Sequence, residues 1–113
     1  MLTIDALKNY GANVDEGLAR CMGNEALYIK LVSTIPSETN FEKLKNSIET
    51  NDLDTAFESA HALKGVTGNL SLTPLFDPIV EITEHLRARE DMDYSELIAE
   101  IITQRDNLGQ LIQ

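Results

Sequence analysis

The chain has 113 residues, of which 42% are hydrophobic and 25% charged, so it fits a globular protein with one domain spanning residues 1–113. Nineteen acidic residues against nine basic ones give a formal net charge of −10. Such a surface repels phosphate backbones and anionic lipid headgroups, which argues against binding to nucleic acids or to membranes.

The single cysteine and the N-terminal residues bear on the cellular compartment. Cys21 alone can form neither an intramolecular disulfide nor a cysteine-based metal site, and a free thiol fits a reducing cytosol. The N-terminus has no basic start followed by an apolar run, so no secretory signal is expected. No stretch reaches the roughly 18 apolar residues of a membrane span. We therefore expect a cytoplasmic protein, and Met1 and the lack of a linker favour a free-standing one.

The N-terminal third is expected to form three helices. The first runs from Thr3 to about Tyr10 and closes at Gly11. Asp15 is expected to cap a second helix that ends near Gly23.

The third helix has Asn24 as its cap, and Pro36 ends it. Its expected inward stripe consists of Leu27, Leu31, Thr34 and Ile35.

Two longer helices follow, on either side of a turn at residues 51–52. Thr39 and Glu42 have the spacing of a capping box for the first of them, and its inward residues are Phe41, Leu44 and Ile48. The second is the central helix, expected over residues 53–70. Its inward stripe recurs at steps of three and four residues and consists of Leu53, Ala56, Ala60, Leu63 and Thr67.

The start of the next helix is ambiguous, because residues 73–74 and 77–78 both combine a capping residue with a proline. An early start would place Pro78 inside the helix, where it must produce a kink. The inward stripe consists of Leu75, Ile79, Ile82 and Leu86. Asp93 and Glu96 have capping-box spacing at the start of the last helix. Its apolar residues are Tyr94, Leu97, Ile98, Ile101, Ile102, Leu108 and Ile112.

Four long amphipathic helices with short connections favour one architecture. We expect an all-α, up-and-down four-helix bundle, with the short N-terminal helices covering one end.

The central helix, LDTAFESAHALKGVTGNL, carries a histidine on its polar side. At about 100° per residue, His61 lies roughly 130° from the centre of the inward stripe, so it should face solvent and pack against little. Its helical neighbours include Gly65 and Gly68, each of which costs a helix about 1 kcal/mol relative to Ala. Side chains lean toward the helix N-terminus, so these glycines would leave bare surface beside His61. Lys64 would place an ammonium within reach of an anion on the ring.

Each of these features has an ordinary explanation. A surface histidine usually has no role, glycines can allow close helix packing, and Lys64 alone is a solvated charge. An exposed imidazole, a nearby cation and cleared surface at fixed spacing are less common together. The combination suits a histidine that accepts a phosphoryl group and meets another protein.

The stretch AHALKGVTGNLS, from His61 through Lys64-Gly65 to Gly68, resembles the signature of histidine-containing phosphotransfer (HPt) domains of two-component phosphorelays. GLARCMGNEALYIKLV, residues 17–32, is similar to the family's opening, and LTPLFDPIVEITEHLR to the helix after the motif. The last helix matches only in kind, and Pro78 departs from the family pattern.

The resemblance implies a four-helix bundle whose histidine takes a phosphoryl group from a receiver-domain aspartate and gives it to another receiver. His61 would be phosphorylated, through Nε2. Lys64 would assist electrostatically, and Gly65 and Gly68 would provide access. Partners would be response-regulator receivers and a sensor or hybrid histidine kinase, with Mg²⁺ supplied by the partner, since the chain has no nucleotide or phosphate-loop motif and no cofactor is expected.

Phe57, one turn before His61, is expected to be half-buried, with its outer edge contributing to a small, transient contact between a monomer and the receiver. His85 is given no role, and two histidines without paired ligand spacing make a metal site improbable. Two alternatives remain: a non-phosphorylated helical adaptor that uses the same face, and a small enzyme that pairs His61 with an acidic residue. The enzyme would need a pocket, for which a narrow bundle has little room.

Overall fold

The computed structural model describes residues 1–113, which form α-helices, one short 3-10 helix and no strand. In chain order the elements are α1 (Ile4–Tyr10), α2 (Val14–Arg20), α3 (Glu25–Ser33), η1 (Ile35–Ser37), α4 (Asn40–Glu49), α5 (Leu53–Asn69), α6 (Thr73–Arg87) and α7 (Ser95–Ile112).

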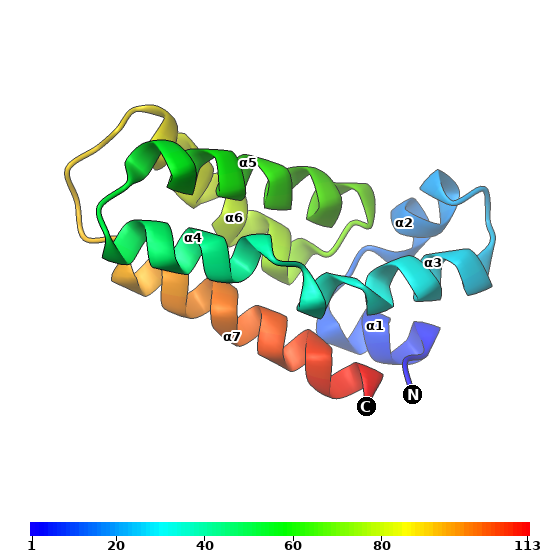
Figure 1. Ribbon diagram of the computed structural model, residues 1–113. Coiled ribbons are helices and arrows are strands. Elements are labelled where there is room, and N and C mark those ends of the chain that lie inside the picture. Colours follow the sequence, from blue (N-terminus) through cyan, green and yellow to red (C-terminus); the bar gives the residue numbers. More distant parts are fainter.

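Helices α4 to α7 form the bundle, and α1 to α3 gather at one of its ends (Figure 1). Helix α5 packs along both α4 and α6, and α6 packs along α7. The loop between α6 and α7 lies at the opposite end from the N-terminal helices. The expected all-α bundle with short helices at one end is therefore confirmed.

The apolar stripes of α5 and α6 face the core as predicted. Leu75, Ile79, Ile82 and Leu86 of α6 are completely buried, as are Ala56, Ala60, Leu63 and Thr67 of α5, whereas Leu53 is only half-buried. Helix α6 begins at Thr73, so the early start is correct and Pro78 lies inside the helix, where it is buried. Pro78 has no N–H to donate to the preceding turn, and the core packing of α6 stabilises the helix across this position.

The predicted inward stripe of α3 is correct at Ile35, which is buried, but wrong at Leu27, Leu31 and Thr34, which are exposed. The buried residues of α3 are Tyr28 and Val32, while Leu27 and Leu31 are 37% and 40% exposed. Tyr28 accounts for this rotation, because its buried hydroxyl donates to the carbonyl of Leu70 at 2.8 Å. Burial also raises the pKa of Tyr28 to about 12.

The ring of Tyr28 also packs directly on α2. A Cβ added at Gly17 would lie only 2.5 Å from the Tyr28 ring. Gly17 thus makes room for Tyr28 although it belongs to a different helix. The apolar periodicity within α3 cannot reveal such a contact.

Helix caps agree with the sequence only in part. Asn24 accepts a hydrogen bond from the first turn of α3, as expected, and Thr3 and Asp52 cap α1 and α5 in the same way. Helix α2 is capped by Asn13, whose side chain accepts from the N–H of Glu16, so the prediction of Asp15 was wrong.

Neither predicted capping box forms. Thr39 has helical backbone angles and makes no side-chain cap, while Glu42 pairs with Arg105 of α7 at 3.1 Å. At the start of α7, the carboxylate of Asp93 accepts from the N–H of Ser95, two residues on. Ion pairing and short-range turns satisfy these groups instead of the reciprocal box.

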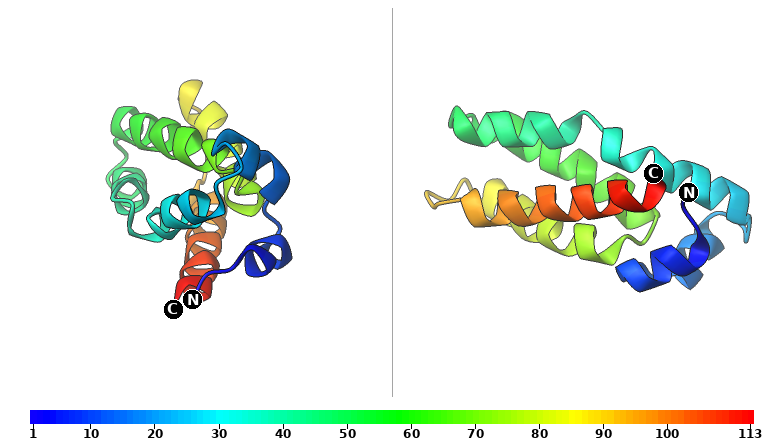
Figure 2. Two further views of the ribbon diagram at one scale, coloured as in Figure 1. Left: turned by 90° about the vertical axis from the view of Figure 1, so that its right-hand side faces the viewer. Right: turned by 90° about the horizontal axis from the view of Figure 1, so that it is seen from below.

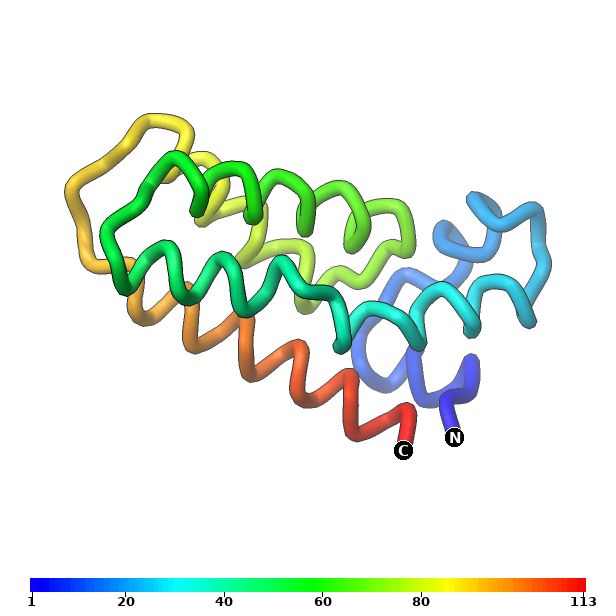
Figure 3. The backbone as a smooth tube through the Cα atoms, in the orientation of Figure 1, coloured from blue at the N-terminus to red at the C-terminus, as the bar shows by residue number.

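The two ends of the chain lie side by side. The terminal ammonium of Met1 donates to the carbonyl of Gln113 at 2.6 Å, and the ends meet in each view of Figures 2 and 3. The right-hand view of Figure 2 shows the chain running from α3 into α4 along one edge of the molecule. None of the helices has the length and apolarity needed to cross a membrane.

Candidate functional site

His61 lies in the middle of α5, on the face away from the buried residues Ala60 and Leu63. Asp52 starts this helix by accepting from the N–H of Thr55 at 3.1 Å. The buried stripe then fixes which side of the helix faces outward. His61 is exposed, which confirms the predicted orientation.

The imidazole of His61 stacks on the ring of Phe57, with the ring centroids 5.8 Å apart and an angle of 19° between the planes. The expectation that the His61 ring packs against little is therefore wrong. Phe57 is half-buried and packs against the core cluster with its inner side. Residues four apart on a helix meet in this way, because their side chains lie one above the other.

His61 borders a shallow, open depression of about 250 Å³. Its other lining residues are Arg20, Lys64, Gly65, Gly68, Asn69 and Phe76. A Cβ added at Gly65 would meet no atom within 4 Å. The surface beside His61 is thus open at Gly65, as the sequence predicted.

Gly68 lies in a different environment. A Cβ at this position would lie 2.8 Å from Cε1 of Phe76, on the adjacent helix α6. Phe76 therefore fills the space that Gly68 was expected to leave bare. The absence of a side chain at Gly68 allows α5 and α6 to pack closely, which corrects the expectation of bare surface.

Lys64 is half-buried and borders the depression beside His61. Its charge also acts on Glu84 of α6. A hydrogen bond from Arg87, the charge of Arg87 and the charge of Lys64 together hold the pKa of Glu84 below its ordinary value, with Arg87 the main cause. The charge of Lys64 thus acts on an anion of its own chain, while Lys64 also borders the depression beside His61.

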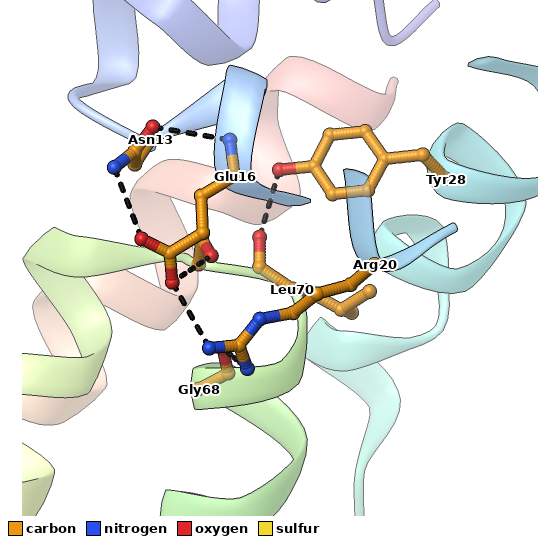
Figure 4. Close-up of polar contacts among 7 residues, drawn as sticks. Asn13, Glu16, Arg20, Tyr28, Gly68 and Leu70 are labelled. Atoms are coloured by element: carbon orange, nitrogen blue, oxygen red, sulfur yellow. Dashed lines mark hydrogen bonds and ion pairs between the residues drawn. The ribbon is translucent and has the colours of Figure 1, made fainter. Parts of the chain in front are cut away.

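Arg20 of α2 is a cation of the depression that sequence reasoning missed. Its guanidinium donates to the carbonyl of Gly68 at 3.0 Å and pairs with Glu16 at 3.1 Å (Figure 4). Glu16 also accepts from Ser71 at 3.0 Å and from the side chain of Asn13. Glu16 and Arg20 have ion-pair spacing on a helix, but nothing in the sequence indicates that α2 reaches the end of α5.

Other candidate groups do not join this site. Nδ1 of His85 pairs with Glu90 near the end of α6, and Cys21 is buried. The structure contains no group of three or more His, Cys, Asp or Glu side chains placed to hold a metal ion.

In a comparison with models of protein families, the Hpt domain family matches residues 36–112, which include α4 to α7 and the whole motif around His61. The chain belongs to the Hpt domain family. Hpt domains perform histidine phosphotransfer in two-component systems and interact with receiver domains and histidine kinases.

The extent of this match refines the resemblance. The last helix, expected to match only in kind, lies within the matched residues, whereas the similarity expected over residues 17–32 lies outside them. No curated protein and no solved structure gives a significant match to the chain.

Proposed function

We propose that His61 accepts a phosphoryl group from the aspartate of one receiver domain and passes it to another in a phosphorelay. One observation carries the proposal: in a chain of the Hpt family, an exposed imidazole lies on α5 beside surface that Gly65 leaves open. A receiver's active site can approach such a ring without displacing a side chain of the bundle.

The transfer is a displacement at phosphorus. The lone pair of Nε2 of His61 forms a P–N bond, the P–O bond to the receiver's aspartate breaks, and the carboxylate leaves with the electron pair. The positive charge on the ring is relieved when Nδ1 releases its proton to solvent. Phosphoryl transfer depends on positioning and charge stabilisation, and the receiver would supply Mg²⁺ and the remaining catalytic groups.

Lys64 and the open surface at Gly65 would assist this reaction. Lys64 borders the same depression as His61, so its ammonium can stabilise the charge of the incoming phosphoryl oxygens. Gly65 provides access. The receiver would dock transiently on the flank of α5 that carries Phe57, His61 and Lys64, with Gly68 at its far edge, and the carrier would act as a monomer in the cytoplasm.

The decisive experiment locates the phosphoryl group. The protein is mixed with an aspartyl-phosphorylated receiver, and intact mass and fragmentation under non-acidic conditions show whether and where a phosphoryl group is added. The expected result is one phosphoryl group on His61 and none on His85, which is a matched second histidine with an internal partner. Binding without a mass shift would instead identify a helical adaptor.

An NMR titration with the receiver tests the docking face separately. We expect chemical-shift changes centred on Phe57, His61, Lys64 and Gly68. Perturbation confined to α4 and α7, or a stable homodimer that buries His61, would contradict the proposed surface.

A further inference from the structure

The two histidines of the chain are held in different ways. Nδ1 of His85 pairs with the carboxylate of Glu90, whereas the imidazole of His61 lies nearly parallel to the ring of Phe57, at 5.8 Å between centroids. An exposed side chain on a helix ordinarily exchanges between rotamers. The flat face of Phe57 restricts that exchange for His61.

Phe57 is itself held from the side of α6 and the loop that follows it. The guanidinium carbons of Arg87 and Arg89 lie 5.0 and 5.2 Å from the centre of its ring, within cation–π range. Arg87 is anchored by Glu84 at 2.9 Å and Arg89 by Asp54 at 2.8 Å. The Phe57 ring is therefore fixed by the core on its inner side and by two anchored cations.

The backbone at the end of α6 supports the same arrangement. Arg89 has φ 52°, in the left-handed region, and its guanidinium also donates to the carbonyl of Leu86. A left-handed residue directly after the helix turns the chain back toward α5, which brings the Arg89 side chain to Asp54 and Phe57. This conformation is unusual for a residue other than glycine.

We propose that Phe57 is a positioning residue for the phosphoryl acceptor, and this inference rests on the proposed function of His61. Its ring keeps the imidazole in one orientation, so that Nε2 is presented to the phosphorus atom in the same way at each encounter. In-line transfer needs the nucleophile within a narrow range of distance and angle. Arg87 and Arg89 maintain the position of the Phe57 ring, and Phe57 itself makes no contact with the transferred group.

The test uses three variants of the full chain. Phe57→Leu keeps apolar bulk and removes the flat ring, and Phe57→Tyr restores the ring. Phe41→Leu is the matched control, because Phe41 is a buried aromatic residue with a guanidinium, that of Arg105, 5.7 Å from its ring centre, and it lies on α4.

Two readouts separate positioning from stability. The first is the NMR shift of the His61 ring protons, which the stacked Phe57 ring displaces. The second is the phosphorylation rate, measured with a phosphorylated receiver and with phosphoramidate, a small donor that needs no docking surface. In the latter reaction Nε2 forms the P–N bond, the donor's own P–N bond breaks, and ammonia leaves after taking up a proton.

We expect Phe57→Leu to abolish the ring-induced NMR shift of the His61 ring protons. It should also slow phosphorylation by both donors by about threefold to tenfold, which corresponds to the free energy of one stacking contact. Phe57→Tyr should restore both readouts. Phe41→Leu should lower the melting temperature while leaving the His61 shifts and both rates at their wild-type values.

Other results would overturn the inference. If Phe57→Leu slows only the receiver, with the phosphoramidate rate and ring shifts unchanged, Phe57 is a docking residue and the function of His61 still stands. If the shifts change but neither rate does, the stack has no positioning role. If wild-type protein is not phosphorylated on His61 by either donor, the proposed function itself fails, even where the ring shifts report an intact stack.

Discussion

Two neighbouring regions of α5 show how one residue type can serve opposite purposes. Gly65 and Gly68 lie three residues apart, and each costs the helix about 1 kcal/mol relative to Ala. At Gly65 a side chain would enter open space, whereas at Gly68 it would collide with Phe76. The carbonyl of Gly68 also accepts from Arg20 of α2. The first glycine keeps surface clear beside His61, and the second allows helices to approach one another.

The largest expected effect comes from removing His61, the proposed phosphoryl acceptor beside the open region. His61→Gln should abolish phosphoryl acceptance from a phosphorylated receiver, measured by intact mass. Because the imidazole stacks on Phe57, the variant should also lose about 0.5–1.5 kcal/mol of stability. His85→Gln is the control and should be labelled as well as wild type. Label remaining on the His61 variant would refute the site assignment.

Filling the open region should affect transfer and spare the fold. Gly65→Leu should slow transfer from a receiver by about tenfold or more, because the new side chain covers the surface beside His61 and displaces the partner from attack geometry. Gly65→Ala should raise the free energy of unfolding by up to about 1 kcal/mol, since its methyl meets no neighbour.

Both Gly65 variants need two measurements, the transfer rate and the thermal midpoint. A Leu variant with an unchanged rate would show that open ground at Gly65 is not needed for access.

Much of the fold follows from helical periodicity in the sequence. The stripes of α5 and α6 repeat at three- and four-residue steps, so they identified both the buried faces and the exposed orientation of His61. The same reasoning failed for α3, where apolar residues occur on more than one face. There Tyr28 is turned inward by Gly17 and the Leu70 carbonyl, and these tertiary contacts leave no periodic signal.

The candidate site was predictable to a similar extent. Spacing alone brought His61, Lys64 and Gly65 together on α5, because all three belong to one helix. The roles of Phe76 at Gly68 and of Arg20 depend on how α6 and α2 pack on α5. The stack of Phe57 on His61 has the spacing of a helical pair, but no sequence pattern indicates that Arg87 and Arg89 lie against the Phe57 ring.

At Gly68, where α5 packs against Phe76, an added methyl group should destabilise the fold, in contrast to Gly65. Gly68→Ala should lower the free energy of unfolding by about 1–3 kcal/mol through overpacking against Phe76, a cost that exceeds the gain in helix propensity. Combining it with Phe76→Leu should recover part of the loss, because the smaller side chain makes room. Denaturant melts of both single variants and the double variant test this coupling. Stabilisation by Gly68→Ala alone would remove the distinction between the two glycines.

The smallest expected effect concerns the cation at the edge of the open region. Lys64 lies close enough to Glu84 for its charge to help lower the pKa of that carboxyl. In the proposed transfer, its ammonium would be shared between Glu84 and the incoming phosphoryl group. Lys64→Ala should slow transfer by about twofold to fivefold, because an accessible ion pair is worth no more than about 1 kcal/mol. The wild-type rate should fall as salt rises, and the difference between variants should narrow.

Glu84→Gln tests the same role of Lys64 from the other side, because it removes the carboxylate that competes with the phosphoryl group for the Lys64 ammonium. Removing that carboxylate should leave the ammonium free for the phosphoryl oxygens, so transfer should proceed at least as fast as in wild type, and faster at low salt. The substitution also releases Arg87 from its carboxylate partner, so the His61 ring-proton shifts must be measured to show that the Phe57 stack is intact. A rate insensitive to Lys64→Ala, to Glu84→Gln and to ionic strength would make Lys64 a bystander. In that case the open surface at Gly65 and the stacked His61 imidazole would be sufficient for transfer, without an assisting positive charge.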